Sequence, residues 1–357
     1  MATHRAAWVI VLAACGGDAG PAGIDAAVVD ALDAPPPLDA IDAPPPPDGA
    51  SDPTQLVEVL AADARVNAVV ANNHHVAWAV ERVSPAGAYV MLDRVAGATL
   101  ATPNTSVLTV YPDGSVAYRA MEMLYPPGLG PTTWSSLCEL VADPGAATLA
   151  FCFDGTVRRW APPFTADPTF GGDGTLDVGV FDDHAVHGTT FTVAVGTSLR
   201  RFDIVTGAPR PSFGNGGQVT VPELIDLLEL HPLPGDRVLM VIRAGGPDRM
   251  RLIVADADGT VHPTVVVQFG RPIVGMGVDD LGRISMFTGV TAGRAYFARF
   301  DATTGAADTS FGGDGLADFP DLPAGPGSST GFGAVGPDGH VYVVAHRILD
   351  AVHARLR

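Results

Sequence analysis

The stretch ADTSFGGDG (residues 307–315) has two relatives in the same chain, ADPTFGGDG (residues 166–174) and PRPSFGNGG (residues 209–217). Each copy follows a run of alternating apolar and polar residues, which is typical of a β-strand. The Asp in two of the copies can accept hydrogen bonds from backbone amides just downstream and so fix a turn. We therefore interpret the phrase as a structural corner rather than as a chemical site.

The aromatic residue and the first glycine of each copy have separate roles in this corner. The phenylalanine is expected to point inward as an apolar wedge between neighbouring blades, and the glycine permits backbone angles closed to other residues. The corner residues are Phe170, Gly171, Phe213, Gly214, Phe311 and Gly312.

Seven predicted β-hairpins accompany the corners, each made of two apolar runs around a turn rich in Pro, Asp, Asn and Gly. They occupy residues 67–80, 107–120, 139–153, 185–195, 228–242, 276–288 and 332–345. With a third strand and the corner, a four-stranded unit recurs about every 40 to 50 residues, which is the range of propeller blades. The sequence predicts an all-β chain whose residues 54–357 form a single seven-bladed β-propeller of four-stranded antiparallel blades, with six or eight blades as alternatives.

The closure of the ring can also be predicted. The last hairpin is followed by only one further strand, while the strand QLVEVLAAD (residues 55–63) precedes the first hairpin and has no blade of its own. We expect it to complete the last blade. The second blade is the least regular, because residues 122–136 carry much Pro and Gly for an outer strand.

The corner Asp308-Thr309-Ser310-Phe311-Gly312 and the hairpin turn Pro337-Asp338-Gly339 resemble the delta-60 repeat, a propeller-like repeat of bacterial proteins. The match is fair around Phe170 and Phe213 and poor before residue 150. The resemblance implies a fold and assigns no activity.

The N-terminus contains a predicted export signal. In residues 1–14, Arg5 is followed by a short apolar run. The run is too short to cross a bilayer as a helix and is typical of an export signal. Leu12-Ala13-Ala14-Cys15 resembles the lipobox of bacterial, myxobacteria-like lipoproteins, which implies a lipid on Cys15 and a membrane as partner. Gly16 in place of Asp favours the outer membrane of the cell envelope. The alternative is an unprocessed apolar N-terminus with an incidental Cys15.

Residues 15–53 are rich in Pro, Asp and Ala and contain no basic residue. Proline runs favour extended polyproline geometry and the Asp residues repel one another, so we predict a disordered stalk. A binding arm for proline-recognising grooves is the alternative.

The formal net charge of −18 argues against nucleic acid or anionic lipid surfaces as partners. The chain contains 21 Lys and Arg residues, all of them Arg. Four of them recur near the end of the predicted third strand of a blade: Arg159, Arg201, Arg299 and Arg355. We expect each to lie along a blade surface and pair with a repeat aspartate such as Asp203 or Asp301. A basic ring that binds an acidic ligand is the alternative.

Cys138 and Cys152 flank one predicted hairpin turn and would face each other across its strands. Exported proteins meet oxidising conditions, so a disulfide is predicted, with two buried free thiols as the alternative.

Other motifs match chemical patterns only formally. GSSTG (residues 327–331) and GFGAVG (residues 331–336) lack the helix that a hydrolase elbow or a dinucleotide site requires. DADGT (residues 256–260) and the GGDG loops leave calcium as an alternative, although no loop supplies enough oxygen ligands alone. His184 and His187 would point to opposite faces of a strand. We predict no catalytic residue, no metal ligand and no cofactor.

These observations together favour a monomeric binding or scaffold module of the cell envelope with an unidentified protein or glycan ligand. A glycan hydrolase or lyase on the propeller is the alternative, because fold does not fix function. The irregular loops at residues 126–133, 244–250 and 320–330 are the first places to look for the ligand.

Overall fold

The computed structural model describes the strands between Leu56 and Leu356 and, apart from residues 144, 146, 163, 271–272 and 289–294, all of residues 138–319; side chains are described chiefly over residues 138–317. The chain divides into two compact units, Met1–Asp48 and Gly49–Arg357. The predicted export signal, Cys15 and most of the predicted stalk belong to the first unit and lie outside the described residues. Over the part that is described, no helix has the length and apolar character needed to span a membrane.

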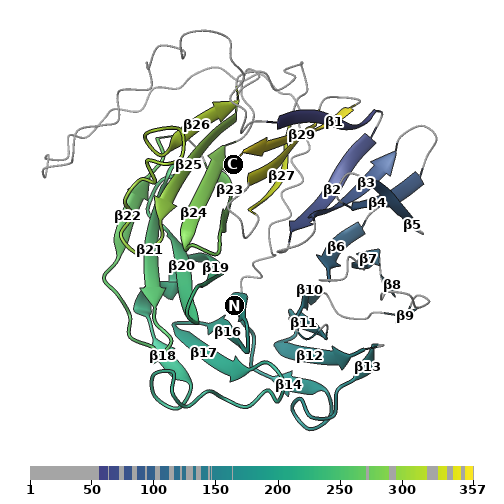
Figure 1. Ribbon diagram of the computed structural model, residues 1–357. Coiled ribbons are helices and arrows are strands. Elements are labelled where there is room, and N and C mark those ends of the chain that lie inside the picture. The colour runs from purple at the N-terminus through teal and green to yellow at the C-terminus, as the bar shows by residue number, and fades with distance from the viewer. Residues whose placement is uncertain are drawn as a thin grey trace, which may run out of the picture. The chain divides into compact units, whose positions relative to one another are not determined.

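The described strands of the second unit form seven sheets of antiparallel strands, coloured in chain order in Figure 1. The first two in chain order are β2 (Ala64–Ala71), β3 (Val76–Arg82), β4 (Gly87–Leu92) and β5 (Val95–Leu100), followed by β6 (Thr105–Val110), β7 (Val116–Ala120), β8 (Met123–Tyr125) and β9 (Thr132–Thr133). The strands β8 and β9 are short, as the Pro-rich sequence of this blade predicts.

The next three sheets contain most of the described side chains. They are β10 (Cys138–Ala142), β11 (Thr148–Cys152), β12 (Thr156–Ala161), β13 (Thr165–Ala166) and β14 (Thr175–Asp177); β15 (Asp183–His187), β16 (Thr190–Val195), β17 (Ser198–Asp203) and β18 (Gln218–Thr220); and β19 (Leu227–Leu233), β20 (Arg237–Arg243), β21 (Arg249–Ala255) and β22 (Val265–Gln268). A short 3-10 helix, η1 (Pro222–Asp226), connects the second of them to the third.

The last two sheets are β23 (Ile273–Val278), β24 (Arg283–Thr288), β25 (Ala295–Asp301) and β26 (Leu316–Phe319), and then β27 (Ser329–Val335), β28 (Val341–His346), β29 (Asp350–Leu356) and β1 (Leu56–Ala62). The strand β1 pairs antiparallel with β29, from Leu56 opposite Arg355 to Ala62 opposite Asp350. The predicted closure of the last blade by the strand at residues 55–63 is therefore confirmed.

The first strands of the sheets lie at the centre of the unit. Contacts join β15 to β19, then β23, β27, β2, β6 and β10 in turn. The sheets of β10 and β15 meet through a shared apolar cluster that includes Phe151 and Phe191. Four-stranded antiparallel sheets arranged with their first strands around a common axis are the architecture of a β-propeller, so the predicted fold class is confirmed.

The second strands carry the densest core. All residues of β11 are buried, as are five of the six in β16 and five of the seven in β20. A strand covered on both faces needs a continuous apolar run rather than alternation, which explains sequences such as VLMVI in β20. Each face packs against the neighbouring sheet, so that the cores are shared between blades rather than enclosed within one.

The three copies of the corner have the same backbone geometry. In each copy the Phe amide donates to the carbonyl three residues earlier, and the carbonyl of that Phe accepts from the last glycine of the phrase. Strand residues Arg159, Arg201 and Arg299 each bond twice to their own corner through backbone atoms. The side chains of Phe170 and Phe213 are 0% exposed and that of Phe311 is 1% exposed.

The first corner glycine is required by close contact as well as by its dihedral angle. Gly171, Gly214 and Gly312 have φ of 62°, 56° and 63°. A Cβ atom at these positions would lie 1.9, 2.2 and 1.6 Å from the carbonyl oxygens of Thr175, Gln218 and Leu316. No side chain fits there without moving the backbone.

The corner also fastens its sheet to the next one. The Gly171 amide donates to the Thr206 carbonyl at 3.1 Å, and the Gly214 amide donates to the Asp258 carbonyl at 2.7 Å. Thr206 and Asp258 lie in the turns after the third strands of the following sheets. The repeated phrase thus joins neighbouring blades, in line with its interpretation as a structural corner. We call the corner together with its hydrogen bond to the next sheet the clasp.

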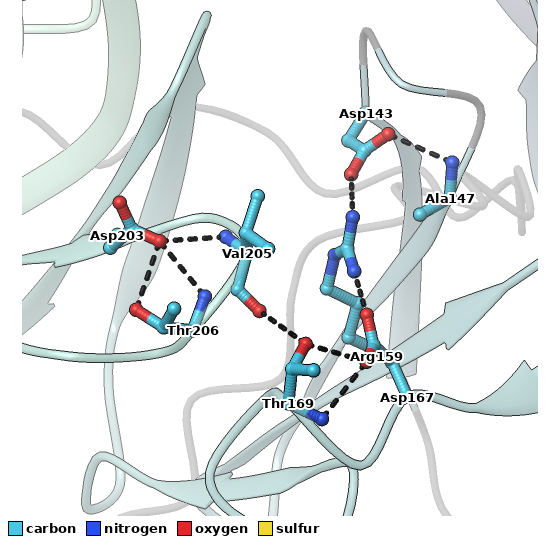
Figure 2. A network of polar contacts seen from close by, with 8 residues as sticks. All are labelled: Asp143, Ala147, Arg159, Asp167, Thr169, Asp203, Val205 and Thr206. Atoms are coloured by element: carbon cyan, nitrogen blue, oxygen red, sulfur yellow. Dashed lines mark hydrogen bonds and ion pairs between the residues drawn. The ribbon is translucent and has the colours of Figure 1, made fainter.

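Figure 2 shows the polar part of the first clasp. Asp143 accepts from the Ala147 amide at 2.8 Å and from Arg159 Nη2 at 2.9 Å, and Arg159 Nη1 bonds Asp167. Asp167 accepts from the Thr169 amide, as the sequence predicted for this turn, and also from the Thr169 hydroxyl. The Thr169 hydroxyl, with a bond at 3.5 Å to the Val205 carbonyl, reaches the turn of the next sheet. The hydroxyl and amide of Thr169 and the charge of Arg159 together lower the pKa of Asp167 against the opposing effect of burial.

The prediction for the recurrent arginines is wrong about their exposure, whereas the predicted pairing with a repeat aspartate is found for Arg159, which forms an ion pair with Asp167. Arg159, Arg201 and Arg299 are buried, with exposed fractions of 8%, 2% and 3%, rather than lying along a blade surface. Asp203 pairs with Arg210 at 2.8 Å, and Asp301 binds the turn at Thr303 and Thr304. The side chain of Arg355 lies outside the described residues.

The reason is that the recurrent arginines point toward the corner. The guanidinium carbons of Arg201 and Arg299 lie 4.1 and 4.2 Å from the ring centres of Phe213 and Phe311. Arg201 also donates to the Asp236 carbonyl of the next sheet at 2.6 Å. Burial lowers the pKa of Arg201 to about 10, so the group still carries its charge at neutral pH.

Cys138 and Cys152 lie opposite each other in the ladder of β10 and β11, and a disulfide joins them. The predicted pairing across this hairpin therefore fits the structure. Both residues are buried beside Leu140 and Tyr111.

Candidate functional site

The two ends of the sheets differ in what their side chains do. We call the end at which each first strand begins the leading end, represented by Cys138, Asp183 and Leu227, and the opposite end, with the corners, the trailing end. Because successive strands are antiparallel, the turns between second and third strands, such as residues 244–248, also lie at the leading end.

At the trailing end the polar side chains are used to hold turns. The carboxylates accept hydrogen bonds from amides two to four residues further along, which is the geometry of Asx-type turns. The trailing-end residues engaged in this way are Asp143, Asp167, Asp173, Asp203, Asp258, Asp279, Asp301, Asp308 and Asp314. These groups are already committed to the architecture.

The calcium alternative concerned this same end. In the DADGT loop, Asp258 accepts from the Thr260 amide at 2.8 Å, and Asp256 pairs with His262 Nε2 at 2.8 Å. Within the described residues, no group of three or more His, Cys, Asp or Glu side chains is placed to hold a metal ion.

At the leading end three acids occupy equivalent positions in successive first strands. Glu139 lies opposite Phe151, Asp183 opposite Ala194 and Glu229 opposite Val241. The third strands give a common reference for comparing these positions. The second-strand residues opposite Arg159, Arg201 and Val254 are Leu149, Thr192 and Leu239. In each sheet the residue that faces the acid lies two positions after that second-strand residue. The three acids therefore form a row along the central strands β10, β15 and β19.

Asp183 is the member of the row that is most enclosed. Its Oδ2 accepts a hydrogen bond from the Leu230 amide on the neighbouring first strand. Burial raises the pKa of Asp183 well above its ordinary value; the Leu230 bond opposes this rise, and the charges of Glu139 and Glu229 add to it. About a quarter of the side chain, 24%, is still exposed. Asp183 thus joins two sheets, whereas Glu139 is exposed and Glu229 pairs with His231 at 3.0 Å.

The raised pKa of Asp183 predicts a pH-dependent stability. The folded state holds this proton more tightly than the unfolded state, so stability falls as the pH rises from the unfolded value near 3.9 through the folded pKa. Asp183→Asn keeps an oxygen acceptor for Leu230 and removes the charge. We expect this variant to have the higher unfolding midpoint above the folded pKa, with the difference vanishing toward about pH 4.

The measurement is thermal unfolding of both proteins from about pH 4 to pH 9. Asp182→Asn is the control, since it removes a neighbouring carboxylate without touching the bond to Leu230. A constant difference between Asp183→Asn and the parent at every pH would contradict the prediction.

The histidines of β15 lie on opposite faces, as predicted. The His184 ring stacks on Phe151 with 3.7 Å between centres, and burial lowers its pKa. His187 lies 3.5 Å from the Thr192 hydroxyl. Burial and then the charge of Arg201 lower the pKa of His187 to about 3, so it stays neutral at physiological pH.

Exposed apolar side chains lie close in the chain to the acids of the row. Phe153, at the end of the hairpin that contains Glu139, is 47% exposed. Val180 precedes Asp183 and is 72% exposed, and Ile225 in η1 precedes Glu229 and is 73% exposed. We call Glu139, Phe153, Val180, Ile225 and Glu229 the leading surface. None of these side chains is used by the corners.

The remaining sequence motifs have clear positions. The motif GSSTG runs into strand β27 (Ser329–Val335), and the first five residues of GFGAVG belong to the same strand, so over the described residues neither motif opens a helix as its pattern requires. Of the three irregular loops, residues 126–131 and 320–328 lie outside the described residues. Residues 244–250 are described, and three of them, Ala244, Gly245 and Arg249, line an open depression at the leading end.

Sequence reasoning missed the row of acids. Glu139 and Glu229 lie at or near the start of predicted hairpins, which is the only available signal. The β-bulge between Leu227 and Glu229 shifts the third acid relative to its strand, so the equivalence is visible only in the register.

Comparisons with known proteins bear on the fold only. No protein-family model and no curated protein matches the chain. Among solved structures, it is similar to YCF48 bound to D1 peptide, with 10% identity, a TM-score of 0.48, and coverage of 85% of this chain and 95% of that one. It is also similar to virginiamycin B lyase from Staphylococcus aureus, with 8% identity, a TM-score of 0.47, and coverage of 85% and 99%. The WD40 β-propeller domain of Doa1 has 12% identity, a TM-score of 0.46, and coverage of 83% and 96%.

Likenesses this distant carry no argument about function. The assignment as a propeller rests on the strand pairing of the chain itself.

Proposed function

We propose that this chain is a binding module of the bacterial cell envelope, held by a lipid on Cys15 and presenting the leading surface of its propeller to a polypeptide partner with basic and apolar side chains. The lipobox-like Leu12-Ala13-Ala14-Cys15 supports the anchor, the Gly16 that follows favours the outer membrane, and the Pro- and Asp-rich residues 15–53 support a stalk.

The observation that carries the binding role is that an exposed acid and exposed apolar side chains occur in neighbouring stretches of the chain at the leading end. Trailing-end aspartates are engaged in turns, whereas the leading surface keeps the exposed acid Glu139 and the exposed apolar side chains of Phe153, Val180 and Ile225. Glu229 is half-buried and pairs with His231. Apolar anchors surrounded by charge are the usual composition of a protein-binding surface. The acids Glu139 and Glu229 select a basic partner by charge complementarity.

The enzyme alternative has less support from the same residues. A glycan hydrolase needs two carboxyl groups placed on either side of the scissile bond. In the row of acids, the enclosed Asp183 is engaged by the Leu230 amide, and Glu229 is engaged by His231. The geometry is better explained by binding.

The test uses the full chain with Cys15→Ser and a labelled peptide of alternating Arg and Phe residues, followed by fluorescence anisotropy. We expect Glu139→Gln/Glu229→Gln to weaken binding about tenfold or more and to flatten its salt dependence. Phe153→Ser/Ile225→Ser should weaken it at all salt concentrations. In cells, the parent should fractionate with membranes and Cys15→Ser should not.

Asp173→Asn/Asp314→Asn is the matched control, because it removes the same charge at the trailing end while keeping the turn acceptors. A peptide in which Glu replaces each Arg should bind more weakly than the peptide of Arg and Phe. Equal binding of the two peptides, or an unchanged affinity of Glu139→Gln/Glu229→Gln for the Arg and Phe peptide, would contradict the proposed binding surface. Membrane fractionation of Cys15→Ser would contradict the anchor.

A further inference from the structure

An open depression lies at the leading end of the sheet formed by β19 to β22. Its volume is about 330 Å³. Its lining comes from the end of β20, the turn after it, the start of β21, one residue of β22 and the end of η1: Asp226, Arg243, Ala244, Gly245, Arg249, Arg251 and Val266. Most of its lining residues belong to the second, third and fourth strands of the sheet and the turn after β20.

The lining carries an excess of positive charge. Arg243, Arg249 and Arg251 supply three guanidinium groups, and Asp226 supplies the single carboxylate. Asp226 lies 3.6 Å from Arg251, and both side chains are partly exposed. Arg243 and Arg249 are exposed, and neither has a hydrogen bond or ion pair from its side chain within the described part of the chain.

The other described arginines are all engaged. They bind carboxylates, hydroxyls or backbone carbonyls: Arg158, Arg159, Arg200, Arg201, Arg210, Arg237, Arg251, Arg283 and Arg299. Among the arginines whose side chains the structure describes, Arg243 and Arg249 are therefore the two without a polar partner, and they lie together beside Arg251 in one depression.

The turn after β20 leaves the depression open to solvent. Gly245 has φ of 84°, and a Cβ atom there would meet no atom within 4 Å. Asp248, the acid of the same turn, is occupied by the Gln268 side chain at 3.2 Å. Asp248 keeps its charge in this hydrogen bond but does not line the depression, where the carboxylate is that of Asp226.

We propose that this depression is a binding site for a phosphate group, with Arg243 and Arg249 as its principal ligands and Arg251 as the third. Guanidinium groups bind phosphate oxygens through paired N–H donors, and such charge-assisted bonds are stronger than neutral ones. Val266, 51% exposed, offers an apolar surface for the group that carries the phosphate. The site is independent of the polypeptide partner proposed above.

The experiment is isothermal titration of the full chain with Cys15→Ser, using inorganic phosphate, glucose 6-phosphate and vesicles of phosphatidylcholine with phosphatidic acid, all at one ionic strength. We expect phosphate to bind with a dissociation constant of about 1 mM or lower. Arg243→Gln/Arg249→Gln should weaken binding about tenfold or more. Tighter binding of glucose 6-phosphate identifies a soluble phosphorylated sugar as the source, and tighter binding of vesicles identifies a lipid headgroup.

Arg158→Gln/Arg237→Gln is the matched control, because it changes the net charge by the same amount elsewhere, and it should bind phosphate as the parent does. Thermal unfolding of both double variants checks that they fold. Absence of phosphate binding in the parent, or equal loss in both double variants, would overturn the proposal, since the second result would show an effect of net charge rather than of a site.

Discussion

Gly214→Ala should destabilise the propeller by about 4 kcal/mol or more. The new Cβ would lie 2.2 Å from the Gln218 carbonyl oxygen and 2.9 Å from its carbon, so the backbone must move. That movement would also disturb the bond from the Gly214 amide to the Asp258 carbonyl, which joins two sheets. Urea unfolding followed by circular dichroism measures the change.

Gly216→Ala is the matched control. Gly216 belongs to the same corner and has a similar φ of 64°, but a Cβ there would meet no atom within 4 Å. Gly216→Ala should lower the free energy of unfolding by only about 1 to 2 kcal/mol, which is the cost of a left-handed backbone conformation for a residue with a Cβ atom. In the other corners Gly172 and Gly313 also leave a Cβ atom with no neighbour within 4 Å, but their φ of 95° and 91° make them a less exact match to Gly171 and Gly312 than Gly216 is to Gly214. If the two alanine variants of a pair were equally stable, the corner would be adaptable and the clasp interpretation would be wrong.

Phe213→Ala is expected to cost about 3 to 5 kcal/mol. The ring is fully buried in a cluster with Val238, Met240 and Ile253 of the next sheet, and its face carries the Arg201 guanidinium. Truncation would therefore leave a cavity between two sheets and remove the aromatic partner of a buried charge. The free energy of unfolding should fall while the disulfide between Cys138 and Cys152 in the preceding sheet stays intact.

Phe153→Ala removes the same atoms from a side chain that is 47% exposed, and its effect should stay below about 1 kcal/mol. Phe170→Ala and Phe311→Ala should behave like Phe213→Ala. A loss for Phe213→Ala no larger than that for Phe153→Ala would show that the wedge does not stabilise the contact between sheets.

The fold could be predicted because its signals are local. A corner such as residues 307–315 combines a turn acceptor, a wedge and a glycine within a few positions, and each role follows from the residue type. The disulfide followed from the symmetry of one hairpin. The closing strand Leu56–Ala62 could be located because it was left over after the hairpins had been assigned.

The arginine partners could not be predicted because they depend on the neighbouring sheet. Arg201 contacts the carbonyl of Asp236 and the ring of Phe213, and nothing in the sequence around Arg201 indicates which groups face it. The row of acids was missed for a related reason, since the bulge before Glu229 breaks the constant spacing that a repeat search detects. For the depression, the loop at residues 244–250 was predicted from irregularity, but the free charge of Arg243 and Arg249 is recognisable only once the other arginines have been paired.

The pairing of β1 with β29 has a mechanical consequence. Repeats that contact only their neighbours can unravel from an open end. Here the outermost repeat has no free end, because the strand nearest the N-terminus lies in the same sheet as the strand nearest the C-terminus. Tension arriving along the segment before Leu56 is borne first by the ladder between β1 (Leu56–Ala62) and β29, so these hydrogen bonds both resist pulling and help to close the ring. A force that strips β1 would leave the packing of β27, β28 and β29 against β2 as the contact between the last sheet and the first.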